Sequence, residues 1–403
     1  MDCCTGIGLA YGMKRTLDSN KSGTLRISIV EPSGMLYGSE LALLDILERL
    51  DRSRFAPEVI LPRQSPFSEK LRAENIPFRE LLLPMAHETA KLRKALTYVN
   101  LARHWWWHRP DLIYVNQGGI LRPVAEIARR LNLPLLCQVQ TLEDARWVSG
   151  MTNLHQLVST FVCNSNFIKT ETKVPEDRLS MLYYGYKAKG LPVSHRRAAR
   201  QAFEVGLLGR ICEGKGHYLL LEVARRLKEE NSTNYHFRFI GNAPTVTERK
   251  RIQDLVANQG LKDMIEFRGY RTDIGAELAE LDVMAIPSVA EPFGRIYCEA
   301  AEARLPVLVS DGGGLGELAK HFRAGSVFAS GDAGDFLLKL ADMRSRYEIR
   351  RQEFEVAAKQ MLAALDLDAY VRLIEQLLES VAARQPISLT WRGNTRETKK
   401  VEN

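Results

Sequence analysis

Short apolar runs alternate with longer amphipathic stretches along most of the chain. The apolar runs are too short to be complete helices, and turn-forming residues flank them, which is typical of buried strands. In the first part of the chain the predicted strands are Leu25–Val30, Pro57–Leu61, Leu112–Val115, Leu135–Val139 and Phe161–Asn164. Amphipathic stretches at Ser39–Leu50 and Pro123–Leu131 predict helices between them. This alternation predicts a parallel sheet covered by helices on both faces.

The alternation stops at residues 187–202, which are basic and polar and include Gly190 and Pro192. We predict an interdomain linker there. The pattern then restarts, with predicted strands at Phe203–Leu208, His236–Ile240, Ile265–Phe267, Leu281–Ile286 and Val307–Ser310. The predicted helices of this part are Lys215–Glu230, Val246–Gln259, Ile296–Arg304 and a continuous stretch at Tyr347–Ala383. Two doubly wound units joined by one linker predict a cleft, into which the loops at the carboxyl ends of the strands project.

The domain bounds follow from the same pattern. The length of 403 residues suits two domains of ordinary size with additional tails. We predict a flexible leader at 1–24, an N-terminal Rossmann-like domain at 25–186, the linker at 187–202, a C-terminal Rossmann-like domain at 203–346, C-terminal helices at 347–385 and a disordered polar tail at 386–403.

Charge and composition narrow the class of protein. The formal net charge of +7 serves solubility, or attraction to anionic lipid or a phosphorylated substrate. Neither zinc-finger spacing nor an RNA-recognition signature occurs, so we expect no nucleic-acid partner. The six cysteines show no CxxC spacing, which favours a reduced, cytoplasmic setting. No apolar run reaches the ~18–20 residues that span a bilayer, and we expect no signal peptide.

The densest chemical pattern lies between residues 281 and 316. Glu291 and Glu299 are separated by seven residues, and Pro292, Phe293 and Gly294 open the helix between them. A helix start offers free backbone N–H groups and the positive end of a dipole, and glycine admits close approach, so a diphosphate would fit there. The acidic side chain of Glu299 could accept hydrogen bonds from sugar or ribose hydroxyls. The alternative is an ordinary strand–loop–helix unit with two surface glutamates.

A second pattern places two cations in one loop. Arg210 and Lys215 follow a predicted strand, and Gly209, Gly214 and Gly216 free the backbone around them. Two cations beside a diphosphate stabilise its charge, and they stabilise it more as the leaving group departs. The sequence lacks the GxxxxGK[ST] pattern of a Walker loop. The alternative is a turn with two solvated basic residues.

A glycine-containing loop, Pro32–Glu40, follows the first predicted strand. Gly34 and Gly38 loosen it, and Ser39 can cap the following helix. Its function is either this cap alone or backbone contact with a donor phosphate or an acceptor.

Together these segments resemble the family 4 glycosyltransferases, which are retaining enzymes with the GT-B fold of two facing Rossmann-like domains. The resemblance is strong over about residues 203–330 and looser over 25–180. It rests on Gly209-Arg210 with Lys215-Gly216, Glu291-Pro-Phe-Gly294 with Glu299, the PVLVSDGGG segment, the glycine loop and Asn164–Phe167.

The resemblance implies a catalytic role for three residues. Arg210 and Lys215 would hold the donor diphosphate, and Glu291 would hold the transferred sugar together with the backbone of Pro292, Phe293 and Gly294. The implied reaction is a front-face displacement, in which the leaving phosphate helps to deprotonate the acceptor hydroxyl. We therefore expect no covalent nucleophile, no cofactor and no metal, because the cations do the charge work and the sequence shows no ligand cluster.

The remaining donor-binding residues are implied in the same way. Glu299 would bind the ribose hydroxyls, Tyr270 would lie by the nucleotide base, Gly241 would shape the same pocket and Gly38 would contact the donor from the first domain. The sequence departs from the family at one place. Many relatives carry a histidine in the segment matching 135–144, where this chain has Gln138 and Gln140. A glutamine could still hydrogen-bond a sugar hydroxyl.

Three consecutive tryptophans, Trp105, Trp106 and Trp107, stand between Arg103 and Arg109. They could insert at a membrane interface, which would suit a lipid-linked acceptor and a peripheral location at the inner face of the membrane. Alternatively they pack a helix end against the core. Three consecutive residues cannot share one helix face, so we expect at least one to be exposed.

These patterns and the resemblance lead to one prediction of function. We expect a glycosyltransferase that moves a hexose-type sugar from a nucleotide-diphosphate sugar to a saccharide or lipid-linked acceptor, in polysaccharide or glycolipid assembly. The alternatives are another GT-B enzyme, such as a sugar epimerase, a phosphorylase or an inverting transferase, and a non-catalytic GT-B binding module.

Overall fold

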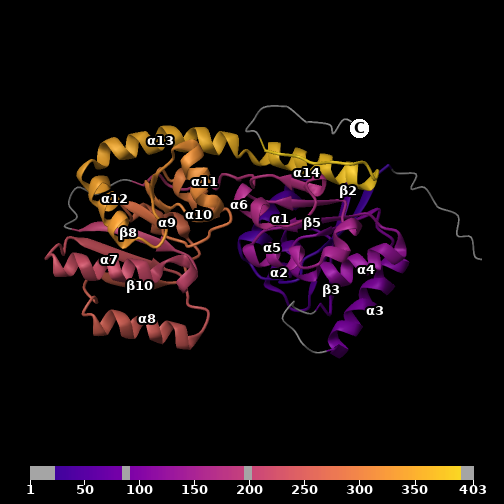
Figure 1. The fold of residues 1–403 in the computed structure, drawn as a ribbon, viewed down its shortest axis with the longest axis horizontal. Coiled ribbons are helices and arrows are strands. Elements are labelled where there is room, and N and C mark those ends of the chain that lie inside the picture. Colours follow the sequence, from indigo (N-terminus) through magenta and orange to yellow (C-terminus); the bar gives the residue numbers. More distant parts are fainter. Residues whose placement is uncertain (1–22, 84–90, 195–201, 392–403) are drawn as a thin grey trace, which may run out of the picture.

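Two parallel sheets, each covered by helices, form two lobes side by side along the longest axis of the molecule (Figure 1). The structure is a computed structural model that describes residues 23–83, 91–194 and 202–391. The predicted α/β class with two doubly wound sheets is confirmed.

The N-terminal lobe contains a seven-stranded parallel sheet in the order β3-β2-β1-β4-β5-β6-β7. The central strands are buried along their whole length, as parallel strands covered on both faces require. The strands are β1 (Leu25–Val30), β2 (Phe55–Pro62), β3 (Phe78–Leu81), β4 (Leu112–Val115), β5 (Leu135–Val139), β6 (Thr160–Cys163) and β7 (Leu179–Met181). The α-helices are α1 (Gly38–Arg49), α2 (Pro66–Ala73), α3 (Lys91–Trp107), α4 (Leu121–Leu131), α5 (Leu142–Ser149) and α6 (Asn166–Glu171).

The C-terminal lobe contains a six-stranded parallel sheet in the order β10-β9-β8-β11-β12-β13. Its strands are β8 (Phe203–Leu208), β9 (Tyr235–Ile240), β10 (Ile265–Gly269), β11 (Val283–Ile286), β12 (Val307–Ser310) and β13 (Ser326–Phe328). Its helices are α7 (His217–Glu229), α8 (Val246–Asn258), α9 (Ile274–Ala279), α10 (Arg295–Glu302), α11 (Gly313–Phe322), α12 (Ala333–Ser345) and α13 (Tyr347–Ala364).

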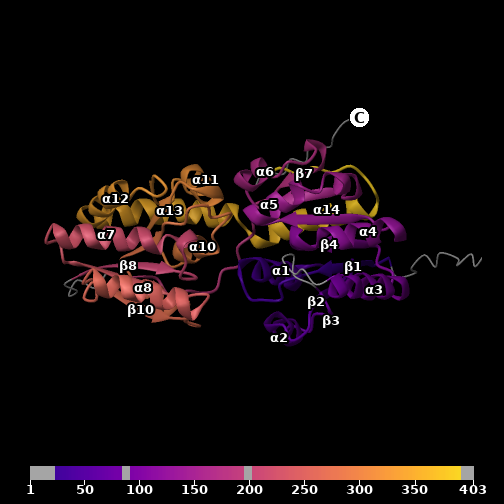
Figure 2. The ribbon, with the colours of Figure 1, turned by 60° about the horizontal axis from the view of Figure 1, so that its bottom comes forward.

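The last helix returns to the first lobe. α14 (Leu367–Ala382) contacts α1, β4 and β5, whereas α13 packs against α10 and α11 of the second lobe (Figures 1 and 2). The predicted C-terminal helices are therefore present, but residues 347–383 are not helical throughout. The chain leaves helical geometry at Leu365 and Asp366, and the Asp366 side chain accepts a hydrogen bond from the Ala369 N–H as the cap of α14.

The residues after α14 are ordered where the structure describes them, although we predicted disorder from residue 386. Thr390 pairs with Met181 at the end of β7, and the Trp391 N–H donates to the Met181 carbonyl at 2.8 Å. The Trp391 ring packs edge-on against Tyr183, with 4.9 Å between centroids. Residues 392–403, the leader up to residue 22 and the linker at 195–201 lie outside the described residues.

The tryptophan segment ends α3, and its three side chains differ. Trp105 is fully buried, and its indole N–H donates to the Ser28 hydroxyl at 2.9 Å, so the predicted membrane contact through this residue is wrong. Trp106 and Trp107 are 63% and 66% exposed, which confirms that the three tryptophans do not share one environment. Within the described residues, no helix has the length and apolar character that crossing a bilayer requires.

Candidate active site

The strand order identifies one loop cluster in each lobe. In the second sheet the order reverses between β8 and β11, and in the first between β1 and β4. Ligands of open parallel sheets bind at such switch points, outside the carboxyl ends of the strands. The loop after β8 carries Arg210 and Lys215, and the loop after β11 carries Glu291. The three residues to which the resemblance gave a catalytic role therefore follow the two strands that flank one switch point.

Lys215 and Glu291 meet directly. The Lys215 Nζ lies 2.5 Å from Glu291 Oε2, with the two side chains 31% and 13% exposed. Gly216 adopts φ +81°, and a Cβ there would lie 2.2 Å from the Pro287 carbonyl oxygen. Only glycine therefore allows the loop that carries Lys215 to pass this close to the end of β11.

Contacts from both lobes fix the start of α10. Gly294 is the N-cap with φ +80°, and a Cβ on it would lie 3.2 Å from Glu291 Cγ. The Glu291 backbone bridges to Gly313, and its carbonyl accepts a hydrogen bond from the Leu315 N–H at 3.1 Å. Phe293 is buried and packs edge-on against Tyr184 of the other lobe, with 5.2 Å between centroids. The start of α10 thus lies beside Glu291, where the sequence predicts an anion site.

Arg210 reaches towards the first lobe. Its guanidinium lies 5.1 Å from the ring centroid of Tyr37, the N-cap of α1. Among the described residues no carboxylate pairs with Arg210, in contrast to Lys215, so its charge is free to meet an anion. Gly38 follows Tyr37, and a Cβ at Gly38 would contact Arg295 Cδ at 3.7 Å. The glycine loop of the first lobe therefore lies against the loop after β8 and the start of α10.

Glu299 is paired with a cation from the linker. It stands on α10 and is buried, and its Oε1 lies 2.5 Å from Lys189 Nζ. The sequence reasoning missed Lys189, because the linker was interpreted only as a spacer. The basic character of the linker was the only feature of the sequence that could have indicated a charged contact for Lys189.

Tyr270 and Gly241 lie at neighbouring strand ends. Gly241 adopts φ +147°, and its N–H donates to the Gly269 carbonyl at 2.8 Å. Tyr270 is 71% exposed, so the structure leaves its ring open to solvent. The residues beside it are firmly held, because both Arg268 and Arg271 form ion pairs with Glu277.

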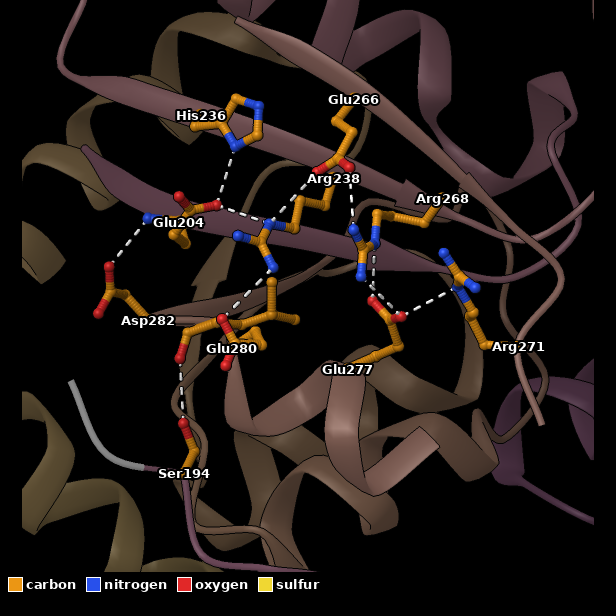
Figure 3. A network of polar contacts seen from close by, with 11 residues as sticks. Ser194, Glu204, His236, Arg238, Glu266, Arg268, Arg271, Glu277, Glu280 and Asp282 are labelled. Atoms are coloured by element: carbon orange, nitrogen blue, oxygen red, sulfur yellow. Dashed lines mark hydrogen bonds and ion pairs between the residues drawn. The ribbon is translucent and has the colours of Figure 1, made fainter. Parts of the chain in front are cut away.

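These ion pairs belong to a larger network on the same face of the sheet (Figure 3). Arg238 on β9 lies 2.8 Å from Glu204 and within 3.9 Å of Glu280. Glu266 pairs with both Arg238 and Arg268 and so joins the two halves of the network. The network ties β8, β9 and β10 to α9 and thereby orients the strand end that presents Tyr270.

The first lobe contributes a buried pair of carboxyl groups that sequence reasoning did not single out. Glu31 and Glu40 are both fully buried, and Asn116 and Gln117 donate hydrogen bonds to Glu31. Burial, reinforced by the nearby charge of Glu40, raises the pKa of Glu31 to about 7. Glu31 also accepts a hydrogen bond from the Ser33 N–H at 2.7 Å, so this pair anchors the glycine loop.

Gln138 and Gln140 bind the protein itself. Gln138 accepts a hydrogen bond from the Tyr114 hydroxyl, and Gln140 accepts one from the Tyr184 hydroxyl at 2.5 Å. The Gln140 amide also donates to the Asn116 side-chain oxygen at 3.0 Å. Both glutamines are buried, so the suggestion that a glutamine there binds a sugar hydroxyl is not supported by this arrangement.

The structure therefore brings Lys215, Glu291 and Gly294 together, and Arg210 lies against Tyr37, which precedes Gly38 in the other lobe. Within the described residues, no three His, Cys, Asp or Glu side chains are grouped so as to hold a metal ion.

Both lobes match models of known domain families. Residues 197–361 match the model described as glycosyl transferases group 1, and residues 38–164 match the model described as glycosyl transferase 4-like domain. Fold and motifs together define the class as the GT-B glycosyltransferases. The two matches together support the family 4 type of glycosyltransferases that the motifs predicted.

Individual relatives are distant. A glycogen synthase of Mycobacterium tuberculosis is 25% identical over 265 residues, which cover 60% of this chain and 61% of the relative. A putative colanic acid biosynthesis glycosyltransferase of Escherichia coli is 24% identical over 175 residues, covering 41% of this chain and 42% of the relative. The chain thus spans about six-tenths and four-tenths of these two relatives.

Solved structures show the same fold. Anabaena HepE in complex with UDP-glucose superimposes with a TM-score of 0.76 at 21% identity, covering 88% of this chain and 100% of that one. At this identity the likeness concerns the fold, and the chemistry of this chain has to be argued from its own residues.

Proposed function

We propose that the protein transfers a hexose-type sugar, with retention of anomeric configuration, from a nucleotide-diphosphate sugar to a saccharide or lipid-linked acceptor. The observation that carries the proposal is the contact of Lys215 with Glu291 beside the start of α10. A diphosphate at this point would meet Lys215, Arg210 and free N–H groups at once. The sugar attached to it would lie next to Glu291.

The residues suggest a front-face displacement. The bond between the anomeric carbon and the phosphate oxygen breaks while the acceptor oxygen bonds to the same face of the sugar. The acceptor proton passes to an oxygen of the departing phosphate, so the protein need not supply a nucleophile. Lys215 and Arg210 would stabilise the charge that grows on the diphosphate as it leaves, an electrostatic effect worth several powers of ten in favourable sites.

The comparisons suggest which donor sugars and which pathway should be tested first. The HepE structure contains UDP-glucose, so UDP-sugars are the first donors to test. Relatives named for glycogen and colanic acid synthesis favour a role in polysaccharide assembly.

Donor binding tests this proposal against a non-catalytic GT-B module. In saturation-transfer measurements with UDP-, GDP- and ADP-sugars, we expect wild type to bind one nucleotide class. Glu299→Ala should weaken that binding at least tenfold. The reason is that a hydrogen bond between a ribose hydroxyl and a charged carboxylate contributes about 1.5–3 kcal/mol to the binding free energy. Glu353→Ala, which removes an exposed carboxylate on α13, is the matched control. Equal binding by wild type and Glu299→Ala would contradict the assigned site, and turnover of the bound donor separates an enzyme from a binding module.

We further propose that α3 touches an anionic membrane surface. Leu96, Val99, Trp106 and Trp107 are large apolar residues exposed on this one helix, and Arg103 lies among them. Exposed tryptophans beside basic residues suit the interface between headgroups and acyl chains. Such a contact would bring a lipid-linked acceptor to the site.

Vesicle flotation tests the membrane contact. With vesicles containing phosphatidylserine, we expect wild type to float and Trp106→Ala/Trp107→Ala to lose at least two-thirds of that binding. Val246→Ala, which removes an apolar side chain that is 82% exposed on α8, is the control. If the double variant floats as well as wild type, or if wild type does not float, the membrane contact is excluded.

A further inference from the structure

Helix α1 of the first lobe turns a charged face towards the second lobe. Asp45 and Glu48 are three residues apart, so they share a face of the helix. Asp45 Oδ2 lies 2.8 Å from the Arg295 guanidinium, and Glu48 lies 2.5 Å from Lys187 of the linker. α1 is therefore connected by charge both to α10 and to the chain that joins the lobes.

Helix α10 of the second lobe also has a charged face, which is directed at the first lobe and the linker. Arg295, Glu299 and Glu302 lie at helical spacing along α10. Each of them contacts either the first lobe or the linker. Glu299 pairs with Lys189, and the Glu302 carboxylate accepts hydrogen bonds from the backbone N–H groups of Lys189 at 2.8 Å and Gly190 at 2.6 Å. The C-terminal part of α10 thus contacts the linker, while the first residue of the helix, Arg295, contacts the first lobe directly.

The Asp45–Arg295 contact is the most enclosed of these ion pairs. Both side chains are 13% exposed, whereas Lys187 and Lys189 in the linker are 43% and 38% exposed. The facing atoms of Asp45 and Arg295 make no hydrogen bond of regular geometry, so the contact depends on charge. An enclosed charge that loses its partner is far more costly than an exposed one. The ion pair therefore contributes to the arrangement of the lobes only while both charges are present, and it acts beside the packing of Phe293 on Tyr184 and of α11 on α6.

The place of this pair connects it to the donor site. Arg295 directly follows Gly294, the N-cap whose helix start would bind the diphosphate. Its side chain passes Gly38 in the first turn of α1 before reaching Asp45. A shift of Arg295 relative to α1 would change how the glycine loop of the first lobe faces the transferred sugar.

We propose that Asp45 and Arg295 are positioning residues whose ion pair latches the two lobes together at the donor site. The latch acts through geometry: it sets the acceptor-side lobe against the start of α10 and leaves the nucleotide contacts within the second lobe. The proposal rests on the proposed function of that helix start as the donor site.

The test measures shape, nucleotide binding and turnover in parallel. Asp45→Asn and Arg295→Gln should each increase the radius of gyration measured by small-angle X-ray scattering. They should lower the rate of UDP-glucose hydrolysis at least tenfold and leave UDP affinity within threefold of wild type. The exchanged pair Asp45→Arg/Arg295→Asp, and the conservative Arg295→Lys, should restore the compact shape. Arg304→Gln, which breaks an ion pair with Glu355 inside the second lobe, should leave all three readings unchanged.

Two results would overturn the latch. Single variants that stay compact show that the pair does not hold the lobes. Single variants that open but are not restored by the exchanged pair show that Arg295 acts without Asp45. If wild type binds none of the UDP-, GDP- and ADP-sugars, the proposed function fails, and the scattering comparison still decides whether the latch exists.

Discussion

The substitution Lys215→Met is expected to lower kcat for donor turnover by about 100- to 1,000-fold, in the range seen when a group that stabilises transition-state charge is removed. Lys215 lies 2.5 Å from Glu291, so its loss also leaves the Glu291 carboxylate without that counter-charge beside an anionic donor. Both consequences raise the barrier to departure of the diphosphate. Initial rates with UDP-glucose, measured from the release of UDP, would record the effect.

A matched lysine distinguishes this effect from the general loss of a charge. Lys250 also pairs with a carboxylate, Asp254, but on the exposed outer face of α8, where the two side chains are 74% and 54% exposed. Lys250→Met should leave kcat within twofold of wild type, because exposed ion pairs contribute little. A Lys215→Met enzyme with the same kcat as Lys250→Met would show that Lys215 does not stabilise the leaving group.

Gly241→Ala should abolish donor binding and lower the free energy of unfolding by about 2 kcal/mol or more. The backbone at Gly241 has φ +147°, and an added Cβ would lie 1.9 Å from the Gly209 carbonyl oxygen. This oxygen belongs to the backbone and cannot rotate away, so the loop before Arg210 has to move. Urea unfolding gives the stability change, and titration with UDP gives the loss of affinity.

The control for this glycine is Gly150→Ala. Gly150 has φ −73° at the end of α5, and an added Cβ would make ordinary contacts at 3.5 Å. Alanine should be neutral or slightly stabilising there, because it restricts the unfolded chain more than glycine does. Normal UDP affinity in Gly241→Ala would mean that the contact between these two loops is irrelevant to the donor site.

The sequence predicted the sheets better than the ends of the chain. β1, β4, β5 and β12 begin and end where we predicted them, since strands covered on both faces are mostly apolar. The helical pattern over α14 was equally visible, but the partners of this helix in the first lobe lie more than 200 residues away in sequence. An amphipathic pattern shows that a face is buried without naming what covers it. The same holds for Trp391, whose contact with Tyr183 depends on the path of the chain after α14.

The residues of the candidate site likewise fall into those that the sequence predicted and those that it did not. Arg210, Lys215, Glu291 and Gly294 were visible because they follow predicted strands on loops that contain glycine. The partners that complete the site come from distant segments: Lys189 for Glu299, Asp45 for Arg295 and Tyr37 for Arg210. Such pairs form only when two lobes meet, so no local pattern encodes them. Gln138 in β5 and Gln140 just after it looked available for a sugar for the same reason, because their tyrosine partners lie elsewhere in the sequence.

A crystal structure with UDP-glucose would show directly where the nucleotide-diphosphate sugar binds. The diphosphate should lie within hydrogen-bond distance of Lys215 Nζ, with Arg210 on its other side and the N–H groups at the start of α10 directed at its oxygens. A nucleotide bound away from these groups, with Lys215 and Glu291 still paired as they are without it, would contradict the account.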